Sequence, residues 1–248
     1  MFTKSQKIFT VLLGIVLFVS SCNNQDPAPN NNGGSTALFN PNITYGSMTD
    51  QDGNDYKTVT IGTQTWMAEN LRTTTYNDGT PITHAPGEAT WAALIEGGYC
   101  VFQNKTDNAF ISTYGFLYNF HAVNTGKLSP AGWHMPTNAE WNTLMNTLGG
   151  ETVAGQKLRE TGSMHWVNYA STVAGTNESG FTGLPGESRA ASGIFPSGVG
   201  TNGHFWTATA DVGTAGNAFS WDLHHGTAVA TRYSEKMVRG FSVRLVKD

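Results

Sequence analysis

The chain has 248 residues, of which only 13% are charged and 11% are aromatic, and its formal net charge is −4. Together with 29 glycines, this balance favours short strands and long ordered loops over a helical bundle. A mildly acidic chain without a basic run is also a poor candidate for nucleic-acid binding.

The first 21 residues have the pattern of a secretory signal peptide. Lys4 and Lys7 precede an uncharged apolar run, residues 8–19, which is shorter than the roughly 20 residues of a membrane-spanning helix. The run ends in "VSSC", which resembles the lipobox of bacterial lipoproteins and implies a mature chain that begins at a lipidated Cys22. Several acyl chains, at ~0.8 kcal/mol per methylene, anchor a protein stably. We therefore expect an exported protein, lipid-anchored to the outer membrane at the cell surface; the alternative is ordinary cleavage beside an incidental cysteine.

Two segments follow the signal peptide. Residues 22–50 include "NNQDPAPNNNGGST", which has almost nothing apolar and predicts a flexible tether. Residues 51–248 contain no second linker of this kind and are expected to form one domain. Cys100 is the only cysteine besides Cys22, so a lipidated chain can form no intramolecular disulfide.

A hairpin is expected near the start of the domain. "TVTI", residues 58–61, is β-branched, Gly62 and Thr63 can turn, and Trp66 begins the return strand. Further along, "YGFLYNFHAVN" from Tyr114 is ambiguous between helix and strand.

The pattern around "PTNAEWNTLMNTLGG" predicts a helix. Thr137 and Glu140 have the spacing of a capping box, in which each side chain accepts a hydrogen bond from the other residue's amide. Apolar residues then follow at helical spacing, and Gly149 with Gly150 can end the helix. A short second helix is expected over residues 152–161.

The second half of the chain has a different composition. Residues 168–236 are dense in Gly, Ser, Thr and Asn, with short aromatic clusters, and predict long ordered loops. The closing "GFSVRLVKD" alternates Phe241, Val243 and Leu245 with polar residues, which is typical of a strand with one buried face. We expect the first and last strands of the domain to meet in one sheet.

Seven short segments in order resemble the blocks of one family. "TVTIGTQTWMAENL", "YGFLYNFHAV", "AGWHMPTNAEWNTL", "AGQKLRETG", "SGFTGLPGESR", "HFWTAT" and "GFSVRLVKD" are similar to the Fibrobacter succinogenes major paralogous domain over residues 56–248. The chain departs from that family at Glu187, where members commonly have a second glycine. "GWHMPTNAEW" also resembles a block of formylglycine-generating and sulfatase-modifying enzymes. The resemblance implies an α+β, C-type lectin-like fold with paired N- and C-terminal strands, two main helices and a loop-rich second half.

Catalytic and metal-binding interpretations find little support in the residues. The chemistry of formylglycine-generating enzymes needs two late cysteines to hold copper, and none follows Cys100. The usual calcium loops of lectins are absent, and Asp211 is better explained as a solvated loop carboxylate. His224 and His225 are adjacent, so a strand would point them to opposite faces. We expect no enzyme activity, no bound metal and no cofactor.

Recognition of a ligand is the remaining function class. Aromatic side chains beside polar groups suit stacking on sugars or packing against a protein. The predicted ligand-binding residues are Trp166, Trp206, Phe219, Trp221, Asp222, His224 and Tyr233. The alternative is that the aromatic residues fill the core, which is favoured for Trp206 and evenly balanced for Trp221.

We therefore expect a surface lipoprotein that binds a glycan or a protein and contacts the membrane only through its lipid. Some lectin-fold lipoproteins are diversified by retroelements just before a fixed terminal strand, and residues 217–239 occupy that place, so a diversified variable protein is a further hypothesis. The alternatives are an enzyme or enzyme-accessory protein acting on the cell surface, and a structural subunit of a surface appendage.

Overall fold

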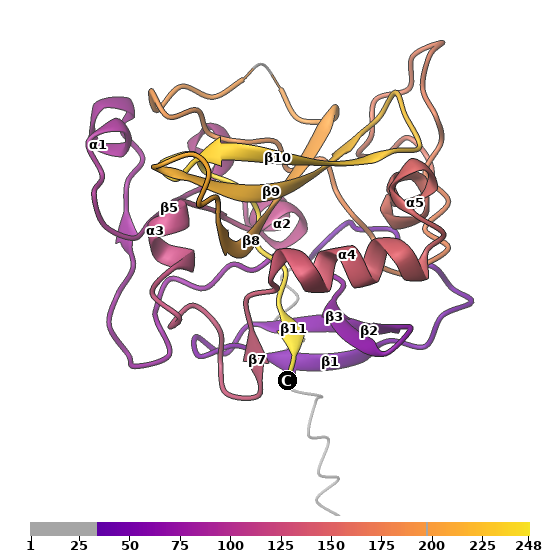
Figure 1. Cartoon of the computed structure of the whole chain (residues 1–248), viewed down its shortest axis with the longest axis horizontal. Helices are drawn as coiled ribbons and strands as arrows, with labels where there is room; N and C mark the ends of the chain where they lie inside the picture. Colours follow the sequence, from indigo (N-terminus) through magenta and orange to yellow (C-terminus); the bar gives the residue numbers. More distant parts are fainter. Residues whose placement is uncertain (1–33, 197) are drawn as a thin grey trace, which may run out of the picture. The chain divides into compact units, whose positions relative to one another are not determined.

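The computed structural model describes residues 34–196 and 198–248. The predicted signal peptide and Cys22 lie outside the described residues. The described chain is an α+β fold, as expected, with three sheets and a few short helices (Figure 1). None of the helices among these residues is long and apolar enough to cross a bilayer.

The first sheet joins both ends of the domain. Its five strands have the order β1 (Gly46–Thr49), β2 (Asp55–Ile61), β3 (Gln64–Met67), β11 (Val246–Lys247) and β7 (Trp133–His134). The expected hairpin is β2–β3, and Val246 of the last strand pairs with Trp66 of β3. The prediction that the first and last strands share a sheet is confirmed.

Residues 34–50 differ from the expected tether, because they are part of the folded unit. Thr36 Oγ1 lies 2.9 Å from His165 Nε2, and the amide of Leu38 donates to Glu160 Oε1 at 2.5 Å. β1 then pairs with β2 over four residues. The polar run ends at Thr36, and Phe39, Ile43 and Tyr45 after it pack against the core. Polar groups of the segment also bond to the chain near residue 160, which sequence reasoning could not identify.

The two predicted helices are α4 (Asn138–Thr147) and α5 (Glu151–Leu158). The capping box of α4 is present: Thr137 Oγ1 accepts from the amide of Glu140 at 3.2 Å, and Glu140 Oε2 accepts from the amide of Thr137 at 2.7 Å. Gly150, with φ +98°, turns the chain directly into α5. The left-handed backbone at this position favours glycine, which explains the short connection.

The ambiguous segment from Tyr114 contains both kinds of structure. α2 (Asn108–Tyr114) ends there, β6 (Leu117–Tyr118) follows, and Asn119 caps α3 (Phe120–Val123) by accepting from the amide of Ala122. β6 closes a second sheet of order β4 (Thr83–His84), β5 (Gly98–Cys100) and β6. Two short helices remain, α1 (Glu88–Ala92) and the 3-10 turn η1 (Phe102–Asn104).

The second half of the chain is less loop-rich than predicted. Residues 202–236 form a three-stranded antiparallel sheet of β8 (Asn202–Ala210), β9 (Asn217–His224) and β10 (Ala230–Lys236). The region between α5 and β8 contains no helix or strand among the described residues. The strands were missed because their Ser, Thr and Asn residues lie among bulky ones without strict alternation, a composition that also occurs in loops.

Both faces of this sheet carry buried side chains. Phe205 and Trp221 pack with Trp141 of α4 and Trp66 of β3 on one side, whereas Trp206 packs with a separate cluster on the other. Sequence position alone does not predict this arrangement, because strand-to-helix packing joins residues about 80 positions apart in the chain, as between Trp141 and Trp221.

Residues 241–246 of the closing segment are all buried, contrary to the predicted exposed face. Arg244 is fully buried between Phe241 and Val246, and its guanidinium donates to Met67 O, Phe181 O and Thr182 O. Burial lowers the pKa of Arg244 to about 9. The alternation of apolar and polar residues suggested an exposed polar face. The sequence pattern does not show whether an arginine is exposed or is buried with carbonyl partners.

Candidate functional site

Three of the predicted ligand-binding residues belong to the core. Trp206 and Trp221 are fully buried and Trp166 is 3% exposed. Each indole nitrogen also donates inside the protein: Trp166 to Gly183 O at 3.0 Å, Trp206 to Tyr118 O at 2.8 Å and Trp221 to Asn138 Oδ1 at 3.2 Å. Their prediction as ligand contacts is wrong, because a buried indole with a satisfied N–H fills the interior.

The other four predicted residues are accessible but do not share one site. Pairing in the β8–β9–β10 sheet places Asp222, His224 and Tyr233 on one face and Phe219 on the opposite face. Asp222 Oδ2 lies 2.7 Å from His204 Nδ1, while His224 and Tyr233 are exposed. Phe219 is half-buried beneath Arg232, whose guanidinium carbon lies 4.8 Å from the centre of its ring.

His224 and His225 do not form a metal site with their surroundings. Their ring centres are 4.3 Å apart, but only His224 is exposed. Burial and the neighbouring His225 lower the pKa of His224. Within residues 34–196 and 198–248, no group of three His, Cys, Asp or Glu side chains is arranged to hold a metal ion.

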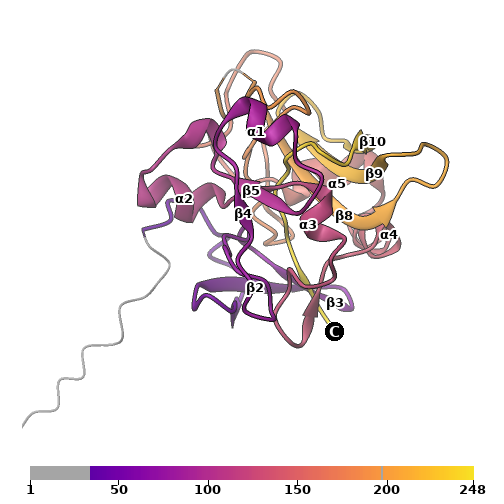
Figure 2. The same ribbon diagram turned by 90° about the vertical axis from the view of Figure 1, so that its left-hand side faces the viewer.

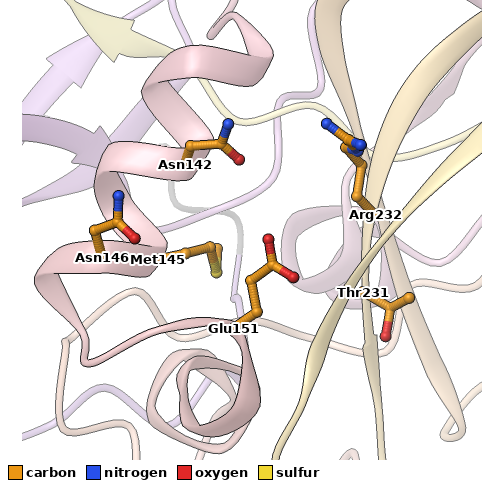
Figure 3. A pocket seen from close by; sticks show the side chains of 6 residues that line it. All are labelled: Asn142, Met145, Asn146, Glu151, Thr231 and Arg232. Atoms are coloured by element: carbon orange, nitrogen blue, oxygen red, sulfur yellow. The ribbon is translucent and has the colours of Figure 1, made fainter.

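A polar groove lies on the Phe219 side of the sheet. It has a volume of about 460 Å³ and runs between α4, the start of α5 and β10. Figure 3 shows the α4 and α5 side chains on one side of the hollow and the β10 side chains on the other. The lining residues are Asn142, Met145, Asn146, Glu151, Thr231 and Arg232.

Local structure explains why these side chains converge. Asn142 and Asn146 are four residues apart on α4, so they lie on the same helical face, and the buried Met145 forms the floor. The turn after α4 places Glu151 in the first turn of α5, where a carboxylate is favoured by the helix dipole. Arg232 enters from the neighbouring strand.

The polar side chains that line the groove have hydrogen-bonding groups available to a ligand. Among the described residues, the side chains of Asn142, Asn146, Glu151 and Arg232 make no hydrogen bond or ion pair with one another or with the rest of the chain. Two amides, a carboxylate and a guanidinium therefore present both donors and acceptors to the hollow. The stack on Phe219 holds Arg232 in place, which lowers the entropy lost when a ligand binds.

Sequence reasoning identified Phe219 but missed the groove itself. Asn142, Asn146 and Glu151 have the appearance of ordinary exposed helix residues, and Arg232 occurs in a strand that was read as a loop. Only the helical spacing of Asn142 and Asn146 could have indicated a shared face.

A comparison of the sequence with models of protein families supports the resemblance that the seven sequence blocks indicated. The model of the Fibrobacter succinogenes major domain matches residues 59–247. The chain belongs to this family. No curated protein and no solved structure matches it. The Fibrobacter succinogenes major domain thus includes α4, α5 and the β8–β9–β10 sheet, and with them every residue of the groove.

Glu187 has a defined role in this member of the Fibrobacter succinogenes major domain family. It is buried with φ +58°, the left-handed conformation in which glycine costs least. Its Oε1 accepts from the amide and hydroxyl of Thr201, at 3.1 and 2.7 Å, and from the amide of Asn202 at 3.0 Å. The carboxylate therefore caps the start of β8, a set of contacts that a glycine could not make.

Proposed function

We propose that the protein is an exported lipoprotein, anchored to the outer membrane through Cys22, that binds a glycan at the cell surface through the polar groove and catalyses no reaction. The basic, apolar and "VSSC" pattern of residues 1–22 supports export and lipidation. Paired end strands and two principal helices support a C-type lectin-like arrangement of the domain.

The observation that carries this proposal is the set of four polar side chains around one hollow that have no hydrogen-bond or ion-pair partner among the described residues. Sugar hydroxyls both donate and accept hydrogen bonds, and planar amide, carboxylate and guanidinium groups can contact adjacent hydroxyls. The hollow of about 460 Å³ is within the ~300–1,000 Å³ range of small-ligand sites. A concave polar site favours a protruding sugar over a flat protein surface, whose buried centre is depleted of charge.

The lining residues favour binding over hydrolysis. Glycosidases generally need two carboxyl groups on either side of the scissile bond. Glu151 is the one carboxylate among the six residues that line the groove, and the six include no histidine or cysteine.

A glycan array tests the proposal. The intact mature chain, purified in detergent, is compared with Arg232→Gln and Asn146→Ala, which remove one groove group each. We expect the wild type to bind at least one glycan and each variant to bind it about tenfold more weakly, which corresponds to ~1.4 kcal/mol. Lys236→Gln on β10 and Thr143→Ala on α4 are the matched controls outside the groove. A wild type that binds no glycan, or variants that bind like the controls, would contradict the proposal.

The groove also bears on the hypothesis of a diversified segment. Residues 217–239 include Phe219, Thr231 and Arg232, so variation there would change one wall of the groove and leave α4 intact. Sequencing the locus from many strains should find changes concentrated at these positions. An unchanged segment in all strains would remove the hypothesis.

A further inference from the structure

A second cleft lies away from the groove, beside α2. In Figure 2, α2 is at one edge of the view and α4, β9 and β10 are at the other. The cleft consists of two hollows of about 530 and 270 Å³ that share Ile111 and Phe116 in their walls. Because these two side chains line both, the two hollows adjoin, and we describe them together as the second cleft.

An aromatic strip forms the floor of this second cleft. β4 and β5 pair with His84 opposite Tyr99, so the two rings lie on the same face of the sheet. Their centres are 5.0 Å apart with planes 24° from parallel, and the Tyr99 and Phe116 ring centres are 4.8 Å apart. His84 is exposed and Tyr99 half-buried, so part of this strip is open to a ligand.

Polar groups border the strip at both ends. At one end, Asp52 Oδ2 accepts from the amide and hydroxyl of Thr74 at 2.6 and 2.8 Å. Burial raises the pKa of Asp52, but hydrogen bonds from Thr75 and Thr74 outweigh it and leave the pKa below its ordinary value, so the carboxylate is charged at neutral pH. At the other end, Lys105 supplies a positive charge.

Several of these polar groups have no partner in the protein. In the part of the chain that the structure describes, the Tyr99 hydroxyl and the side chains of Lys105, Thr106 and Asn108 make no hydrogen bond or ion pair. The backbone of Gln103 and Asn104 beside them is left-handed, with φ of +49° and +52°. Strain of this kind in non-glycine residues is commonly found at binding sites.

We propose that this cleft is a separate binding site for an oligosaccharide, with one pyranose ring packed on the exposed part of the His84–Tyr99 pair and its hydroxyls bonded to Asp52 and Asn108. The C–H face of a pyranose is apolar and packs on aromatic rings, while its edge carries hydroxyls that match the amide and carboxylate of the rim. Charges of both signs line the cleft, from Asp52 and from Arg72 and Lys105, and hydroxyl groups, which both donate and accept hydrogen bonds, suit such a lining. Two adjoining hollows of about 530 and 270 Å³ have room for more than one ring.

A second site would let the protein bind two glycan chains at once, which the groove alone could not do. Because α2 and β10 are on different sides of the domain, a protein with both sites filled would join two glycan chains. The second site does not depend on the groove, and each can fail without the other.

Isothermal titration of the intact mature chain with cellotetraose, xylotetraose, maltotetraose and chitotetraose tests the second site. We expect binding of at least one tetrasaccharide, weakened about tenfold or more by Tyr99→Leu, which keeps an apolar group against Phe116. Asn108→Ala, a change at an exposed rim position, should weaken binding several-fold without disturbing the core. Tyr233→Leu, at an exposed tyrosine of β10, and Arg232→Gln in the groove should leave the affinity unchanged.

Three outcomes would overturn the proposal. Failure of all four tetrasaccharides to bind would do so, as would binding that Asn108→Ala and Tyr99→Leu both leave intact. A Tyr99→Leu variant that loses its circular dichroism spectrum is set aside, and Asn108→Ala then decides. Binding of unstructured peptides that Asn108→Ala abolishes, with no tetrasaccharide bound, would assign the cleft to peptides instead.

Discussion

Replacing Trp221 with alanine tests whether this residue belongs to the core or to a binding surface. Trp221 is fully buried, its ring is 6.3 Å from that of Trp141 in a nearly parallel stack, and its N–H donates to Asn138 at 3.2 Å. A buried tryptophan removes roughly 200 Å² from water, which at about 25 cal/mol per Å² is worth ~5 kcal/mol. Part of this is recovered by alanine and by relaxation of the cavity.

We therefore expect Trp221→Ala to lower the free energy of unfolding by about 4 kcal/mol, within the range of ~3–5 kcal/mol measured for such truncations. Trp221→Phe keeps a ring against Trp141 but loses the hydrogen bond to Asn138, and should cost roughly 1–2 kcal/mol. Urea unfolding followed by far-ultraviolet circular dichroism measures both, and the alanine variant should shift the midpoint by about 1.5 M.

Tyr233→Ala is the matched control, because Tyr233 is 48% exposed on the neighbouring strand. It should change the stability by less than ~0.5 kcal/mol. If Trp221→Ala were no more destabilising than Tyr233→Ala, Trp221 would not be a core residue, and its earlier interpretation as a ligand contact would return.

Two further predictions concern titratable side chains. Burial raises the pKa of the Cys100 thiol to about 12, so iodoacetamide should alkylate Cys100 only in denaturant; rapid alkylation of the native protein would contradict its buried position. His134 lies 2.7 Å from Glu140 and 2.6 Å from Asp248; burial lowers its pKa, but these hydrogen bonds and charges outweigh burial and raise it. A histidine whose pKa is higher in the folded than in the unfolded protein contributes its full stabilisation below about pH 6.5, the unfolded pKa. This contribution is lost as the pH rises through the folded pKa. His134 is 39% exposed, so His134→Gln should cost only about 0.5 kcal/mol at pH 6 and less at pH 9 in urea titrations. A cost that grows with pH would refute the assignment.

Local features of the fold were predictable because their partners are neighbours in the sequence. Thr137 and Glu140 are three residues apart, so the capping box of α4 depends on no distant contact. The β2–β3 hairpin joins adjacent segments through a two-residue turn, which residues 58–66 specify by themselves. The order of short sequence blocks was sufficient for the family.

Burial and the two clefts depended on distant parts of the chain. The same aromatic pattern that predicted a binding surface put Trp206 and Trp221 inside, because α4 and β3 cover one face of the β8–β9–β10 sheet and the Phe241 segment covers the other. A period of two shows which residues share a face of a strand but does not show what packs on that face.

By itself, the sequence determined the family, the hairpin, the capped helix and the pairing of the end strands. Each of these follows from short-range spacing or from blocks in order. The tertiary structure alone decided which side chains face solvent: it buried Arg244 and the three tryptophans predicted as ligand contacts. It also placed Asn146 and Arg232 around one groove, and Asp52 and Tyr99 in adjoining hollows. The physical reason is that exposure is a property of how distant segments pack together, and no single segment contains that information.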